Sequence, residues 1–363
     1  MKEFIKGLDL SESFFYECAL PLLQKKYPDL RYTAALIGWG SDVLGYDDTA
    51  STDHCWGPRF MLYLRDEDDC KKHEIYDMFA QNLPHEHRGF SAHFTGEGHE
   101  EGVRGMNPFT GGNLKPFIEI VALEEYVGGW HIGISDLANI SDLDWLTLSE
   151  HRLLGITSGR IFKDDLGLKE RLEHIRFYPE NVRLYLIASN WELISKEEAF
   201  VKRCADVGDE IGSALICGRI AERLMRLAFL YCRKYAPYSK WFGTAFSRLP
   251  VSVDLKNALL KAVTASDIET RENEIIRAQL LTADLHNKAG ITEFIDIKID
   301  DDFLRRGIKS IHAYKIANMV QAKLKGTALE KCPLIGTFNG VAEMNDLWDF
   351  LPLMKKAKAI YES

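Results

Sequence analysis

The pattern of hydrophobic and polar positions changes near residue 145. Before that point, short apolar runs alternate with polar stretches and with segments of helical periodicity, a pattern typical of a mixed α and β domain. Strands are expected at residues 32–37, 59–64 and 116–123, and helices at 11–26 and 66–83. From about residue 146 onward, the pattern predicts helices almost throughout. The sequence therefore predicts an α+β protein, with a mixed sheet and flanking helices in residues 1–145 and a helical bundle in residues 146–363.

The second half contains clear helix signals. Long helices are expected at residues 211–233 and 267–287, where apolar residues recur at helical spacing. Ser195 and Glu198 have the spacing of a capping box, which predicts that a helix begins at Ser195. In the first half, residues 96–113 are rich in Gly, His and Glu and are expected to form a loop.

Composition narrows the class of protein. The chain has 363 residues, of which 46% are hydrophobic and 27% charged, as in ordinary globular proteins. Its net charge of −9 argues against a protein that coats a long nucleic acid, because such proteins need a basic face. The N-terminus lacks a signal-peptide pattern, and no apolar run approaches the roughly 18 residues of a membrane helix. We therefore expect a cytoplasmic protein without a membrane segment.

One stretch, GWGSDVLGYDDTASTDHCWGPR at residues 38–59, makes a poor core and a poor linker. Gly40 and Ser41 follow an apolar strand, where backbone N–H groups and a hydroxyl are suited to binding phosphate. A strand that ends in Gly-Ser, with a carboxylate about a dozen residues later, resembles the DNA polymerase β-like nucleotidyltransferase superfamily. That resemblance implies Mg²⁺ as cofactor, an NTP as substrate, and Asp53 and Glu119 as catalytic metal ligands.

Cys55 departs from this pattern. The superfamily has a second carboxylate two residues after the first, on the same face of a strand, and Cys55 occupies that place. A thiol is a poor ligand for Mg²⁺, which prefers oxygen. Residues 56–58 (Trp-Gly-Pro) also interrupt the strand that should continue there. Asp47 and Asp48 are expected to form a turn, and they are the next candidates for the second metal ligand if Cys55 does not supply it.

A more specific resemblance covers most of residues 30–250. It depends on the separated motifs GSDVLGYDD, STDH-x-WGPR, RCADVGDEIGS, MRLAFL and YAPYSKWFGTAF. Together they resemble the family described as domain of unknown function 4037, which is regarded as nucleotidyltransferase-like. The resemblance implies a nucleotidyltransferase-like fold and leaves the activity open.

Several basic and aromatic residues are candidates for nucleotide binding. Arg219, Arg223 and Arg226 share one stripe of a helix, which either binds a triphosphate or an acidic substrate or is an ordinary solvated stripe. Arg59 either anchors a phosphate or pairs with a structural carboxylate. In the YAPYSKWFGTAF motif, Lys240 is a candidate for phosphate contact and Tyr238 for stacking on a base or sugar; the alternative is an aromatic plug between helices.

The helical half also supplies a candidate general base. Antibiotic-type nucleotidyltransferases carry such a base on their helical domain, and by resemblance Asp209 or Glu210 takes that role here. The predicted function is Mg²⁺-dependent transfer of a nucleoside monophosphate from an NTP to a hydroxyl of a small molecule or protein. The alternative is a nucleotide-binding module that keeps the fold without catalysis. A third option is a helical interaction protein with an inert α/β head.

Overall fold

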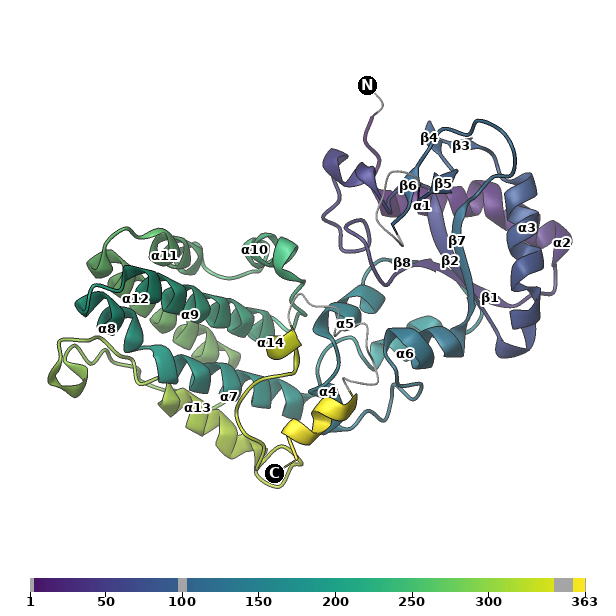
Figure 1. The fold of residues 1–363 in the computed structure, drawn as a ribbon. Helices are drawn as coiled ribbons and strands as arrows, with labels where there is room; N and C mark the ends of the chain where they lie inside the picture. The colour runs from purple at the N-terminus through teal and green to yellow at the C-terminus, as the bar shows by residue number, and fades with distance from the viewer. Residues whose placement is uncertain (1–2, 97–102, 343–354, 363) are drawn as a thin grey trace. The chain divides into compact units, whose positions relative to one another are not determined.

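The computed structural model describes residues 3–96, 103–342 and 355–362 and has the α+β architecture that the sequence predicts (Figure 1). The chain forms two compact units. The first consists of Met1–Ile140 and His151–Arg176, and the second of Ser141–Glu150 and Phe177–Ser363. The predicted boundary after residue 145 thus lies in a stretch that belongs to the second unit, and the chain then returns to the first unit for 26 residues (151–176).

The first unit contains a four-stranded mixed sheet in the order β7-β2-β1-β8. Its strands are β1 (Tyr32–Leu36), β2 (Arg59–Leu64), β7 (Phe117–Ala122) and β8 (Arg160–Asp164). Strand β2 runs parallel to β7, whereas β1 is antiparallel to both β2 and β8. The sequence did not predict β8, because four of its five residues are only half buried and form no apolar run. This edge strand is what brings the chain back to the first unit.

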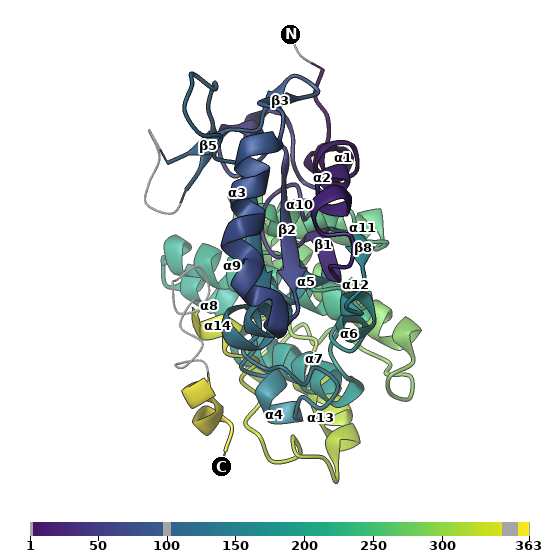
Figure 2. The same ribbon diagram turned by 90° about the vertical axis from the view of Figure 1, so that its right-hand side faces the viewer.

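Helices cover one face of this sheet. They are α1 (Gly7–Phe14), a π-helical turn (Phe15–Ala19), α2 (Leu20–Lys26) and α3 (Lys72–Asn82), which lie beside the strands in Figures 1 and 2. Alternate strand residues such as Phe60 and Leu62 point into the core that they share with Phe14, Phe15 and Phe79. The intervening residues of β2 and β7 therefore belong to the opposite face, which carries the polar candidates.

Short elements complete the first unit. They are β3 (Glu86–His87), β4 (Phe90–Ser91), β5 (Phe94–Thr95), β6 (Gly105–Met106), α5 (Glu150–Thr157) and α6 (Leu168–Glu173), with α5 beginning at the last residue of the second unit. Strands β3 and β4 form one small ribbon, and β5 and β6 form another. The ribbon β5–β6 lies inside the expected loop region, of which residues 97–102 are outside the described residues.

The second unit is helical. Its helices are α4 (Asp142–Trp145), α7 (Glu180–Glu197), α8 (Phe200–Asp206), α9 (Glu210–Tyr231), α10 (Ser239–Ser247), α11 (Val253–Thr264), α12 (Ile268–Ala289), α13 (Tyr314–Gln321) and α14 (Asn339–Ala342). The prediction that a helix begins at Ser195 is wrong. Ser195 lies inside α7 and its hydroxyl donates to the Glu192 carbonyl at 2.7 Å, because the apolar face of α7 continues to Ile194. Within the described residues, no helix has the length and hydropathy needed to span a membrane.

Candidate functional site

The turn that follows β1 has a backbone that only glycine tolerates at residue 40. Gly40 has φ of +124°, outside the range that other residues adopt readily. A Cβ atom there would lie 2.5 Å from Nη2 of Arg59 and closer still to Oδ1 of Asp42. Glycine is therefore required because the backbone passes directly over a charged pair. The turn is built around that pair.

Asp42 and Arg59 form a buried ion pair, with side chains 1% and 4% exposed. Nη2 of Arg59 lies 2.9 Å from Oδ1 of Asp42, and Nε lies 3.3 Å from Oδ2. Nη2 also donates to the Trp39 carbonyl at 3.1 Å, and the guanidinium packs on the Trp39 ring. Nε and Nη2 of Arg59 are engaged within the fold, which favours the alternative of a structural ion pair, and the nucleotide role of Arg59 stays a prediction. Arg59 holds the turn.

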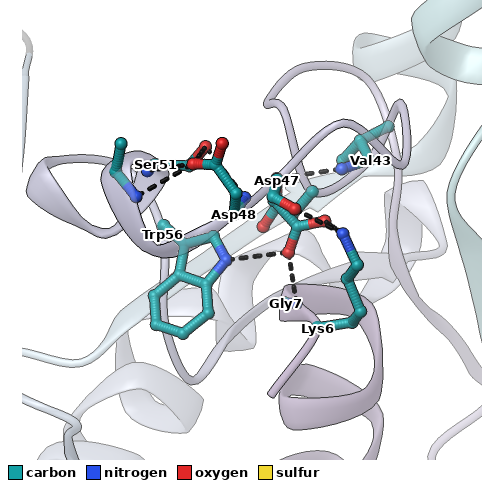
Figure 3. Close-up of polar contacts among 9 residues, drawn as sticks. Lys6, Gly7, Val43, Asp47, Asp48, Ser51 and Trp56 are labelled. Carbon is teal, nitrogen blue, oxygen red and sulfur yellow. Dashed lines mark hydrogen bonds and ion pairs between the residues drawn. The ribbon is translucent and has the colours of Figure 1, made fainter. Parts of the chain in front are cut away.

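Two further acidic residues of the motif are also structural (Figure 3). Asp47 is buried and accepts hydrogen bonds from the Gly7 amide at 2.7 Å and the Trp56 indole at 3.1 Å, and it pairs with Lys6. Asp48 caps the 3-10 helix at Thr49–Asp53 by accepting from the amides of residues 50 and 51. Asp47 therefore links the loop to Gly7, Lys6 and Trp56, and Asp48 begins the 3-10 helix.

Asp53 and Cys55 do not lie on a strand. Asp53 ends the 3-10 helix, its side chain is 64% exposed, and Oδ2 lies 2.8 Å from Nδ1 of His54. Partial burial raises the pKa of Asp53, but the hydrogen bond and charge of His54 outweigh it and hold that pKa below its usual value. Cys55 has φ of +49° and its amide donates to the Arg104 carbonyl at 2.7 Å. The expected pair of positions on one strand face is therefore absent here, since β2 begins only at Arg59.

Glu119 lies in the middle of β7, opposite Met61 of β2 and on the sheet face of Arg59. Burial raises the pKa of its carboxyl group, and the nearby positive charges of Arg59 and Arg104 offset part of that rise. Among the described residues, the Glu119 carboxylate has no hydrogen-bond or ion-pair partner. The Ser41 hydroxyl likewise makes no hydrogen bond within the described part of the chain.

The donor set of this face does not fit a magnesium centre. Cations flank Glu119, and the charge that acts on Asp53 is that of His54. No group of three or more His, Cys, Asp or Glu side chains is placed to hold a metal ion within residues 3–96, 103–342 and 355–362. A two-metal clamp needs several carboxylate oxygens around one point. Asp53 and Glu119 do not supply such a set.

The arginine stripe of α9 has three different environments. Arg219 pairs with Glu197 of α7, with Nη2 2.6 Å from Oε1. Arg226 pairs with Glu222 at 2.8 Å. Arg223 lies between them, and its enclosed Nε has no hydrogen-bond partner in the described residues. The three side chains line one cavity of about 210 Å³ whose walls all belong to the second unit.

Other predicted residues of the helical unit lie outside that cavity. Asp209 is the exposed N-cap of α9 and accepts from the Gly212 amide at 2.8 Å, which is a structural role. Tyr238 precedes α10, and Lys240 is exposed with Nζ 5.1 Å from the Trp241 ring centroid. Neither side chain is among those that line the cavity. Phe242 of the same motif stacks on Phe229 of α9, so this motif packs largely as an aromatic plug.

Comparison with known proteins bears on the helical region. Residues 145–242 match the family model for the Domain of unknown function (DUF4037). The resemblance to this family is confirmed. The DUF4037 match includes the arginines of α9 and the Lys240 motif, whereas the Gly40 turn lies outside the matched residues.

Structural comparison gives a weaker likeness. A nucleotidyltransferase-like protein from Exiguobacterium sibiricum 255-15 is similar with a TM-score of 0.32 and 11% sequence identity, over 87% of this chain and 88% of that one. A TM-score this low carries no argument about activity. A search of curated proteins finds no match.

Proposed function

We propose that this protein binds a nucleotide through the turn at residues 40–42 of its first unit. One observation carries the proposal: the amides of Gly40, Ser41 and Asp42 donate no hydrogen bond to the described residues, and the Ser41 hydroxyl is also free. Consecutive free N–H groups form a concave site for an anion. The Asp42–Arg59 pair fixes this backbone before any ligand arrives. Preorganised donors of this kind suit a phosphate.

The contacts favour a binding module over a metal-dependent transferase. Asp42, Asp47 and Asp48 are all engaged within the fold, and Cys55 replaces a carboxylate. Phosphate binding by backbone amides needs none of these side chains as metal ligands. The net charge of −9 also favours a small nucleotide over a long nucleic acid as partner.

Transfer of a nucleoside monophosphate is the second candidate, and Glu119 is the observation in its favour. A desolvated carboxylate with a raised pKa and no partner in the described residues is suited to take a proton. In this reaction a hydroxyl oxygen of the acceptor bonds to the α-phosphorus of the NTP, pyrophosphate leaves, and Glu119 takes the hydroxyl proton. The acceptor would be a small molecule or a protein.

The test is thermal unfolding of the full chain with each of the four NTPs, with and without Mg²⁺. A ligand that binds only the native state stabilises it by roughly 2.7 kcal/mol at a hundredfold excess over its Kd. We expect stabilisation by at least one NTP, reduced in Ser41→Ala, which removes the hydroxyl and keeps the amide, and unchanged in Ser247→Ala, whose hydroxyl donates to the Thr244 carbonyl. No shift with any NTP at millimolar concentration would contradict the proposal.

The second candidate is tested with an NTP labelled at the α-phosphate. If the protein is a transferase, label accumulates on an added acceptor or on the protein itself, and Glu119→Gln removes that transfer while leaving NTP binding in place. Binding without any transfer of label would leave the binding module as the function.

A further inference from the structure

The second unit contains a partly open cavity of about 210 Å³ that the nucleotide proposal does not use. Its lining includes apolar side chains, among them Leu186, Leu193, Phe229, Leu230 and Ile335. The lining also includes the three arginines of α9, together with Glu150, Glu222 and Asn190. A cavity of about 150 Å³ is large enough for benzene. This cavity therefore accommodates a body of about one aromatic ring with a polar end.

The ion pairs around the cavity involve two of the three arginines of α9, and Arg226 pairs with Glu150 at 3.6 Å as well as with Glu222. Arg219 and Arg226 are matched by Glu197 and Glu222, at 2.6 and 2.8 Å. Arg223 has neither an ion pair nor a hydrogen bond among the described residues, and its Nε is enclosed by protein atoms. An unpaired guanidinium in a partly desolvated place costs stability, so the fold alone gives no reason for it. Its terminal nitrogens are the donors that remain for a ligand.

We propose that this cavity binds a small molecule that carries one oxyanion, a carboxylate or a phosphate monoester, on an apolar body. Arg223 holds the oxyanion with its planar fork, and the apolar side chains of the lining contact the body. Among the described residues, Arg223 has no hydrogen bond or ion pair, so its guanidinium is matched to a single anionic group of the ligand. Glu150 and Glu222 also line the cavity, and their negative charges favour a ligand with one anionic group over a triphosphate.

This site is separate from the turn at residues 40–42, because all of its lining residues belong to the second unit. It therefore goes beyond the proposed nucleotide function and is tested independently of it. Burial also lowers the pKa of Arg223, with Glu197 and Glu222 offsetting part of this effect. A bound oxyanion would offset the cost of that burial by its attraction to the guanidinium.

The experiment is calorimetric titration of the full chain with phenyl phosphate and with benzoate, and with benzyl alcohol and inorganic phosphate as partial probes. We expect phenyl phosphate or benzoate to bind, and each partial probe to bind at least tenfold more weakly. The stronger of the two complete probes identifies the oxyanion. Equal affinity for benzyl alcohol would overturn the role of the charge.

Variants locate the site. Arg223→Met should weaken the better probe at least tenfold, and Arg223→Lys should retain part of the affinity because it keeps the charge and loses the fork. The matched control is Arg277→Met on α12, where the arginine is 44% exposed and pairs with Asp254, and it should bind as wild type does. Loss of binding in Ser41→Ala with retention in Arg223→Met would place the anion at the turn and overturn the proposal. Absence of binding by both complete probes at roughly 10 mM, well above a Kd of about 1 mM, would also overturn it.

Discussion

Each unit of the molecule contains a sheltered arginine, and the two differ in what surrounds them. Arg59 in the first unit donates to Asp42 and Trp39 and packs on aromatic rings. Arg223 in the second unit faces a cavity and has no partner in the described residues. A buried charge that is fully paired contributes to the fold, whereas one left unpaired at the wall of a cavity is held there at a cost to stability. The contrast separates a structural cation from a ligand-binding one.

Removal of Asp42, the ion-pair partner of Arg59, should lower the free energy of unfolding more than any other change predicted here. Asp42→Ala leaves a buried guanidinium without its carboxylate, and we expect the free energy of unfolding to fall by about 3–5 kcal/mol. Urea denaturation followed by circular dichroism measures the change. The control is Asp53→Ala, because Asp53 is 64% exposed and its pair with His54 should contribute only about 0–1 kcal/mol. Similar losses in the two variants would contradict the structural role of the Asp42–Arg59 pair.

The second unit contains a buried carboxyl group that extends the comparison. Glu198 is 6% exposed and accepts from the amides of Ile311 and Ala313 at 3.3 and 3.4 Å. Burial raises its pKa from 4.5 to about 7, against the hydrogen bonds that lower it. Between these values the folded state binds more protons than the unfolded state does. Stability should therefore fall as pH rises from 4.5 to 7, by roughly 2–3 kcal/mol from this group.

Glu198→Gln isolates this contribution, because glutamine does not titrate. We expect the pH dependence of the unfolding free energy in that window to become flatter in the variant than in wild type. Glu222→Gln, at an ion-paired and half-exposed position, is the control and should keep the wild-type slope. An unchanged slope in Glu198→Gln would show that the carboxyl group titrates normally in the folded state.

Local pattern was enough to predict the sheet strands that have continuous apolar runs. Strand β2 occupies the predicted residues 59–64, because all six side chains are buried. It was not enough for β8, whose place at the sheet edge depends on pairing with β1 more than 120 residues earlier. It also failed at Ser195, where the local capping pattern is overridden by the packing of α7.

The candidate site shows the same limit. The spacing of the arginines of α9 predicts that they share one stripe, but only the fold shows that Glu197 of α7 pairs with Arg219 and not with Arg223. The 3-10 helix at Thr49–Asp53 begins with mutual hydrogen bonds between Asp48 and Ser51, a local signal that the expectation of a strand overlooked. Local spacing in the sequence does not show which side chains from distant parts of the chain will form ion pairs.

Replacement of Arg223 should have an effect of the opposite sign to that of Asp42→Ala. Arg223→Met removes an unpaired, partly desolvated charge and keeps an apolar stem, so we expect the ligand-free protein to gain about 1 kcal/mol. Urea unfolding of the two ligand-free proteins measures it. Arg226→Met leaves Glu222 without its ion-pair partner and should lower the free energy of unfolding. A loss of stability in Arg223→Met comparable with that in Arg226→Met would mean that Arg223 has a structural partner.

The smallest effect is expected at Cys55, where an oxygen ligand can be restored. Cys55→Asp supplies the carboxylate that the nucleotidyltransferase resemblance expects, and aspartate tolerates the left-handed backbone that Cys55 adopts. The new side chain would not share a strand face with Asp53, which ends a 3-10 helix. We therefore expect overlapping Mg²⁺ titration curves for wild type and variant and a change in unfolding free energy within about 0.5 kcal/mol. Cys55→Val is the matched control for the backbone and should lose about 1–2 kcal/mol, because a β-branched residue is strained at this φ. A large gain in Mg²⁺ affinity in Cys55→Asp would show instead that the site is a transferase centre that lacks one ligand, and it would restore Asp53 to the metal.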